Sequence, residues 1–210
     1  MVRFRISYSK KAGMRYTSNL DIHRIWERSL RRAQLPLAYS QGFHPQPKLV
    51  QACPLPLGMV SSAEIIDVWL ETEFDQTTLI DAIKPALPPG LDIHSIETVD
   101  LNAPSLPKQV VAADYVVTLL DPVDPQQLDE RVTRLLQAGE IYREWRGKQV
   151  DLRPLIEEIE ILPPDEQGRL CLKLRLAARE GATGRAEQVM AVLGYDPFET
   201  RVERVKLHIR

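Results

Sequence analysis

The first ten residues alternate between apolar and polar side chains, which is the two-residue period of a β-strand. The apolar set is Val2, Phe4, Ile6 and Tyr8, and the polar set is Arg3, Arg5, Ser7 and Ser9. Successive side chains of a strand point to opposite faces of its sheet. This pattern therefore predicts a strand with one buried face and one wet face.

A helix is predicted next, because apolar side chains recur at helical spacing from Ser18 to about Gln34. Its core-facing positions are Ile22, Ile25, Trp26, Ser29, Leu30 and Ala33. Ser18 with an acid three residues later suits an N-cap, and Pro36 ends the helix. The opposite side carries Arg24, Arg28, Arg31 and Arg32. This stripe predicts an anion-binding surface, and the alternative is an ordinary solvated helix face.

The segment after the helix is rich in proline and glycine. Its members are Pro36, Pro45, Pro47, Pro54 and Pro56, placed around Gly42 and Gly58. Proline fixes φ and lacks an N–H donor. We therefore expect a rigid loop, held without regular backbone hydrogen bonds, that presents side chains to a ligand.

The rest of the first half completes a simple order of elements. Strand-like runs at 48–53 and 64–71 predict a hairpin, Asp75 caps a helix through about Leu87, and 91–100 is a further strand. The stretch 102–108, with two prolines, has the composition of a linker.

The second half repeats the same order. Its predicted elements are a strand at 115–120, a helix from 124 to about 139, strand-like pieces at 141–145 and 150–162, a strand at 169–178, a helix at 185–193 and a strand at 201–209. Each half thus reads β-α-β-β-α-β. This order predicts an α+β chain of two tandem ferredoxin-like (βαββαβ) units with antiparallel sheets. The units are residues 1–107, basic in its first fifty residues and with the proline-rich loop, and residues 108–210.

The charge distribution adds to this picture more than the net charge does. The 210 residues are 44% hydrophobic and 27% charged, which is typical of a soluble globular protein, and the net charge is −2. Residues 1–50, however, hold ten Lys or Arg against Asp21 and Glu27, while residues 51–107 hold nine acids against Lys84. A nucleic acid or another polyanion would be attracted to the first fifty residues.

The two cysteines, Cys53 and Cys171, lie far apart without metal-binding spacing. We interpret them as buried thiols of a reduced, cytoplasmic protein, and we expect no metal and no cofactor. The first residues lead into strand alternation rather than an apolar run, so we expect no cleavable signal and no association with a membrane.

The proline-rich loop contains several candidate ligand-binding groups. They are Ser40, Phe43, His44 and Lys48, with Arg15 preceding the helix. Rigid prolines around Lys48 would lower the cost of ordering it on an anion. Phe43 and Tyr39 are candidates for stacking on a nucleic-acid base, and the alternative is that both rings fasten the loop to the first sheet.

His44 is conceivable as a general base, but its segment offers no neighbouring acid. We therefore interpret it as a structural histidine, bonded to the loop backbone. A metal site made of His23, His44 and Cys53 has no recognised ligand spacing. We predict no catalytic residue.

Two segments of the second half could contact phosphate. Arg146-Gly147-Lys148 is predicted to be a basic hairpin tip beside Trp145, and the alternative is a solvated turn. Residues 181–185 precede a helix but lack the full spacing of a phosphate-binding loop.

Four runs resemble the radical SAM-linked family of bacterial proteins, which lie beside or are fused to radical S-adenosylmethionine enzymes. They are residues 11–24, 31–36, 40–48 and 54–58, and the run Val150-Asp151-Leu152-Arg153-Pro154 resembles a motif of the second half. Asn19 and Gln46 stand where the family usually has histidines. The resemblance implies a radical SAM partner. This chain is not itself such an enzyme, because its two distant cysteines cannot hold the three-thiolate cluster.

The leading interpretation is a non-catalytic module that binds an anionic substrate, RNA above all, and acts with a radical SAM protein. One alternative is a metal-independent endoribonuclease, similar to the tandem ferredoxin-like enzymes of CRISPR systems, although Gly194-Tyr195-Asp196-Pro197 stands where those enzymes have a glycine-rich loop. Another alternative is a scaffold whose arginine stripe docks an acidic protein.

Overall fold

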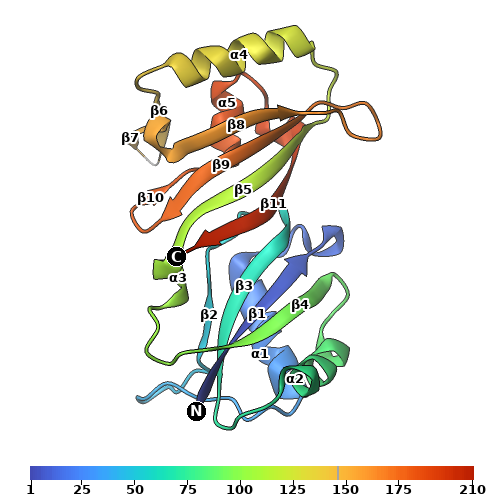
Figure 1. The fold of residues 1–210 in the computed structure, drawn as a ribbon, viewed down its shortest axis with the longest axis vertical. Coiled ribbons are helices and arrows are strands. Elements are labelled where there is room, and N and C mark those ends of the chain that lie inside the picture. Colours follow the sequence, from blue (N-terminus) through green and yellow to red (C-terminus); the bar gives the residue numbers. More distant parts are fainter. Residues whose placement is uncertain (146) are drawn as a thin grey trace. The chain divides into compact units, whose positions relative to one another are not determined.

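The computed structural model describes residues 1–145 and 147–210, with the side chains of Trp145 and Lys148 outside the description. The chain divides into two compact units, Met1–Val110 and Val111–Arg210. It is a mixed α+β protein with extensive, mostly antiparallel sheet and few helices (Figure 1). The expected α+β class is confirmed.

Unit 1 contains four strands and three helices. In chain order they are β1 (Val2–Lys10), α1 (Asn19–Arg32), β2 (Leu49–Gln51), β3 (Val60–Leu70), α2 (Gln76–Ile83), β4 (Leu91–Val99) and the short α3 (Leu106–Gln109). The strands lie in the order β2-β3-β1-β4, and all three pairs are antiparallel. The predicted hairpin, β2 with β3, is confirmed.

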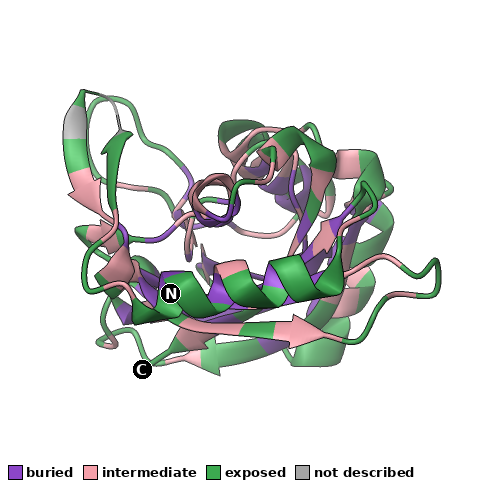
Figure 2. Ribbon diagram, turned by 90° about the horizontal axis from the view of Figure 1, so that it is seen from above, coloured by how far each residue is buried: buried purple, intermediate pink, exposed green. Residues whose placement is uncertain are grey.

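One face of this sheet carries the core of unit 1. Phe4, Ile6 and Tyr8 of β1 are buried together with apolar side chains of both α1 and α2. Trp26 of α1 is fully buried and meets the Tyr8 ring edge to face, with 4.9 Å between ring centroids. Both helices therefore pack on the same face of the sheet. Figure 2 colours the ribbon by burial, and buried stretches alternate with exposed ones along the helices and strands that it shows.

The other face was expected to be wet, and this expectation was wrong for its two arginines. Arg3 is 1% exposed and Arg5 is 6% exposed. Both guanidinium groups donate to the carboxylate of Asp67, which is 0% exposed and lies opposite Arg5 on β3. Arg3 also donates to the carbonyls of Ala103 and Pro104, so the segment before α3 lies over this face.

Unit 2 repeats the order of elements with two additions. Its elements are β5 (Val110–Leu119), α4 (Pro125–Gln137), β6 (Tyr142–Trp145), β7 (Lys148–Asp151), β8 (Ile156–Leu162), β9 (Cys171–Arg179), β10 (Ala182–Thr183), α5 (Ala186–Val192) and β11 (Thr200–Ile209). The strands lie in the order β8-β9-β5-β11, β10 pairs with the end of β9, and β6 with β7 forms a separate hairpin.

Each unit pairs an Asp with an Arg across two neighbouring strands of its sheet. In unit 1, Arg5 of β1 lies opposite Asp67 of β3. In unit 2, Asp114 of β5 lies opposite Arg175 of β9, and the guanidinium donates to both carboxylate oxygens at 2.8 and 3.1 Å. The acid lies on β3 in the first pair and on β5 in the second, and the sequence alone did not reveal either pair.

Candidate anion-binding surface

The arginine stripe lies on α1, whose start is fixed by its N-cap. Ser18 Oγ accepts a hydrogen bond from the Asp21 amide at 3.2 Å, and it donates to the Asp21 carboxylate at 2.7 Å. An acid in the first turn and Arg31 and Arg32 in the last turn both suit the helix dipole. The helix buries Ile22, Trp26, Ser29 and Leu30 and exposes Arg24, Arg28, Arg31 and Arg32.

Neighbouring groups partly neutralise this stripe. Arg24 pairs with Asp21 at 3.4 Å and Arg31 pairs with Glu27 at 2.8 Å. Arg32 donates to the Ala86 carbonyl at 3.3 Å. In the described part of the chain Arg28 forms no ion pair, so it is the stripe's most available charge.

The proline-rich loop is fixed at its base by backbone hydrogen bonds, contrary to the expectation that it would lack them. The Ala38 amide donates to Trp69 O, and the Lys48 amide donates to Ala38 O, so the loop starts and ends on the edge of the sheet. Further out, Tyr39 bridges to Pro47, the Ser40 amide donates to Gln46 O at 2.8 Å, and Ser40 Oγ accepts from the Gln46 amide at 3.0 Å. The prolines do not prevent these backbone hydrogen bonds, because the other residues of the loop still supply amide donors.

The helix and the loop meet through a cation–π contact. The guanidinium carbon of Arg31 lies 5.9 Å from the centroid of the Tyr39 ring. Beyond this contact, Phe43 and His44 are exposed at the loop tip. We call the surface formed by Arg24, Arg28, Arg31 and residues 39–48 the α1–loop surface.

The other first-half candidates occupy different surroundings. Lys48 is half-buried, and its ammonium lies 3.7 Å from Met1 Sδ. Arg15 is half-buried, and its Nε has no hydrogen-bond partner among the described residues. The Arg15 carbonyl accepts from Lys10 Nζ at 3.2 Å and from the Gly58 amide at 3.1 Å.

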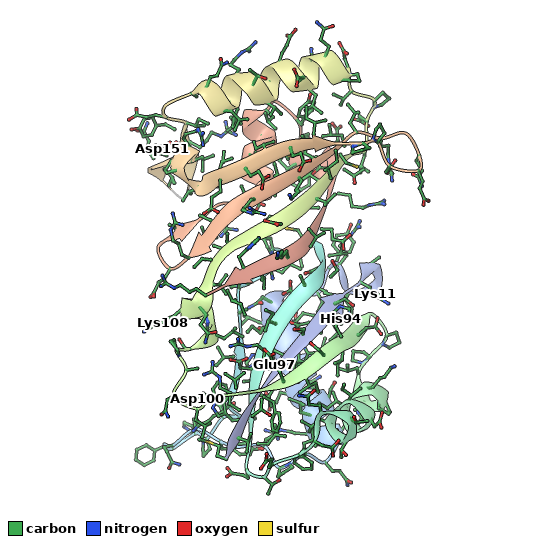
Figure 3. The ribbon with its side chains drawn as sticks, viewed as in Figure 1. Lys11, His94, Glu97, Asp100, Lys108 and Asp151 are labelled. Carbon is green, nitrogen blue, oxygen red and sulfur yellow. The ribbon has the colours of Figure 1, made fainter. Side chains whose placement is uncertain are left out.

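The second-half motif Val150–Pro154 holds the β6–β7 hairpin in place. Asp151, at the base of this hairpin (Figure 3), accepts from the amides of Ile141 and Arg153. Arg153 donates to Ile156 O at 3.0 Å and to Leu136 O at 3.3 Å, which joins the end of α4 to the start of β8. The predicted contacts at the hairpin tip, Arg146 and the Lys148 side chain, lie outside the described residues.

A charged network on the sheet of unit 2 was not expected from the sequence. His208 Nε2 lies 2.9 Å from Asp114 Oδ1, so this carboxylate meets both His208 and Arg175. Burial acts to raise the pKa of Asp114, but the hydrogen bonds from Arg175 and His208 outweigh it and lower this pKa. The alternation in β5, β9 and β11 puts these side chains on one face, although nothing local in the sequence links them.

Metal and membrane sites find no support among the described residues. In that part of the chain no group of three or more His, Cys, Asp and Glu side chains is placed to hold a metal ion. Cys171 is buried as expected, whereas Cys53 is half-buried. None of the described helices is both long enough and apolar enough to span a membrane.

Together, these features define an α+β protein with a basic helix beside a rigid loop. The chain belongs to the family described as "uncharacterized protein conserved in bacteria" (DUF2344), whose model matches residues 3–186. That description names no radical SAM enzyme. No curated protein matches the chain.

Comparison with solved structures finds one chain with a related fold and a second with a weaker likeness. A chain in the crystal structure of a Cbf5–Nop10–Gar1 complex is similar with a TM-score of 0.50 and 12% identity, over 97% of this chain and 48% of that chain. A chain of the archaeal box H/ACA sRNP Nop10–Cbf5 complex gives a TM-score of 0.49 and 13% identity, over 98% and 48%. This protein thus spans about half the length of those chains.

Proposed function

We propose that this protein is a non-catalytic binding module for an anionic ligand, namely RNA, and that the α1–loop surface is its binding site. The contact of Arg31 with the Tyr39 ring carries this proposal, because it joins the exposed arginines to the stiff, aromatic loop. Guanidinium groups bind phosphate through paired donors. Aromatic rings beside basic side chains form a platform that suits RNA better than an acidic protein surface.

The proposal also includes the fold of each unit and the partner protein. We take each unit as a ferredoxin-like βαββαβ unit, since β2-β3-β1-β4 and β8-β9-β5-β11 place corresponding strands in the same order. We also take a radical SAM protein as the partner, on the resemblance of residues 11–58. Co-purification of such an enzyme with the tagged chain tests the second point.

Charge reversal at Arg28 and Arg31 tests the binding site. Glutamates there are expected to weaken binding of a single-stranded RNA at low salt about tenfold or more, and to reduce the slope of log affinity against log salt by about 1.4, for two lost phosphate contacts. The melting temperature should change little, because exposed helix pairs contribute only about 0.2–0.5 kcal/mol each. New pairs of position 28 with Arg24 and Arg32 oppose the loss of the Arg31–Glu27 pair and the repulsion between Glu27 and a glutamate at position 31.

The matched control reverses Arg179 and Arg210, which are exposed in unit 2 and change the net charge equally. If both double variants lost RNA binding to the same extent, the loss would reflect net charge and would contradict the proposed site. Binding of an acidic protein in place of RNA would favour the scaffold. Cleavage of bound RNA in chelator, lost in His44→Gln, would favour the endoribonuclease.

The hairpin tip provides a separate prediction. If Arg146 and Lys148 each contact a phosphate, replacing both by alanine should reduce the salt slope by about 1.4 and leave sequence preference unchanged. Filter binding across a salt series measures both quantities. An unchanged slope would leave the tip as a solvated turn.

A further inference from the structure

Phe43 has the most exposed large apolar side chain of the α1–loop surface. Its exposure is 102% of the reference value, so both faces of the ring are open to solvent. Burial of a phenylalanine side chain normally stabilises a fold, and at this position the fold gains none of that stabilisation. The ring therefore has no evident role in the fold of the chain.

The loop holds this ring in a preorganised position. The Ser40–Gln46 hydrogen bonds and the Tyr39–Pro47 bridge close the loop directly below its tip. Gly42 adopts φ +131°, a conformation that side chains rarely allow, so the glycine lets the chain turn just before Phe43. Because the loop is already ordered, little conformational entropy is lost when the ring meets a ligand.

Tyr39 and Phe43 have different roles in this arrangement. The Tyr39 ring is 40% exposed and is engaged by the Arg31 guanidinium, so it braces the loop against α1. Phe43 is the aromatic ring of the loop that is open on both faces. The Arg31 guanidinium, which contacts Tyr39, places a positive charge at the base of the same loop.

We propose that Phe43 stacks on an unpaired base of the bound RNA, while the arginines of α1 hold the adjacent phosphates. This inference rests on the proposed function and narrows its ligand to RNA with single-stranded nucleotides. Bases inside a duplex are already stacked on one another, whereas unpaired bases are free to stack on aromatic side chains. A lipid surface fits less well, because the ring stands alone between polar neighbours, Gln41, Gly42 and His44, and offers little apolar area for insertion.

The experiment compares the full-length wild-type chain with Phe43→Leu, which keeps an apolar side chain and removes the aromatic face. Its matched control is Phe198→Leu, since Phe198 of unit 2 is 94% exposed. The probes are a single-stranded RNA containing 2-aminopurine, whose fluorescence falls on stacking, and the same RNA annealed into a duplex. Circular dichroism confirms that each variant folds.

We expect Phe43→Leu to bind the single strand about 5- to 150-fold more weakly, since base–aromatic stacking contributes about 1–3 kcal/mol. Its salt slope should equal that of the wild type, and duplex affinity and the Phe198→Leu variant should be unchanged. Quenching of 2-aminopurine should occur with wild type and be lost with Phe43→Leu.

Two results would overturn the stacking role while leaving the proposed function in place. The first is unchanged affinity and quenching in Phe43→Leu. The second is binding of wild type to vesicles of phosphatidylserine and phosphatidylcholine that Phe43→Leu loses, with RNA binding intact. Absence of any salt-dependent RNA binding by wild type would instead overturn the proposed function, and this inference with it.

Discussion

Replacing Asp67 by asparagine is expected to destabilise the chain by about 3 to 5 kcal/mol, the usual cost of removing one partner from a buried ion pair. The Asp67 carboxylate accepts from Arg3 at 2.6 and 2.9 Å and from Arg5 at 2.9 and 3.1 Å. Without it, two guanidinium groups would be left buried with no counter-charge, and the asparagine amide would direct donors at donors. Denaturant unfolding measures the loss.

Glu97→Gln is the matched control for this prediction. Glu97 lies on β4 (Figure 3), in register with Arg5 on the other side of β1, but its side chain is exposed. Its replacement should change the free energy of unfolding by no more than about 0.5 kcal/mol. If Asp67→Asn were equally mild, the carboxylate would not hold the arginines, and other groups would have to balance their charge.

The cluster of Arg3, Arg5 and Asp67 shows which features the sequence could predict and which it could not. Strict alternation located the first strand, because the two-residue period is a local property. It also put Arg3 and Arg5 on the correct face, but it could not tell that Asp67 and the carbonyls of Ala103 and Pro104 cover them. Covering groups about 60 and 100 residues away leave no periodic signal in the strand itself.

Buried cations also reduce the charge available to a polyanion. Residues 1–50 hold ten Lys or Arg, but Arg3, Arg5 and Lys10 are buried. A count of all Lys and Arg residues thus overstates the positive charge that is exposed to RNA. The exposed side of α1 could be predicted from helical spacing, whereas the Arg31–Tyr39 contact could not, since it depends on how the loop returns to the sheet.

Helix starts were predicted well because capping is local. Ser18, Asp75 and Asp124 each accept from an amide two or three residues later. Helix ends were less accurate: α1 ends at Arg32 rather than near Gln34, and α2 ends at Ile83 before a 3₁₀ turn at Lys84–Ala86. α1 ends just before Gln34, which adopts φ +55°, and α2 ends two residues before Pro85.

Replacing Lys10 by methionine is expected to destabilise the chain by about 2 to 4 kcal/mol, because each buried carbonyl that loses its donor costs about 1–3 kcal/mol. Lys10 is 2% exposed, and its ammonium donates to the carbonyls of Arg15, Thr17 and Met59. The Arg15 carbonyl keeps the Gly58 amide as a second donor, so the loss is felt mainly at Thr17 and Met59.

The neighbouring substitution Lys11→Met provides the control. Lys11 is exposed and pairs with Asp92 at the surface, where an ion pair contributes little. Lys10→Met should also speed hydrogen exchange of the Gly58 amide, because the Arg15 carbonyl that accepts from it is no longer fixed by Lys10 and the remaining bond opens more often. An unchanged unfolding midpoint with a protected Gly58 amide would show that other contacts hold these loops.

Lys10 also lies next to the start of the helix that carries the proposed binding site. Thr17 directly precedes the Ser18 N-cap, so the lysine anchors the chain where α1 begins. We therefore expect Lys10→Met to weaken RNA binding through loss of folded protein, with the salt slope of the remaining folded fraction unchanged, whereas reversal of Arg28 and Arg31 lowers that slope in a protein that stays folded.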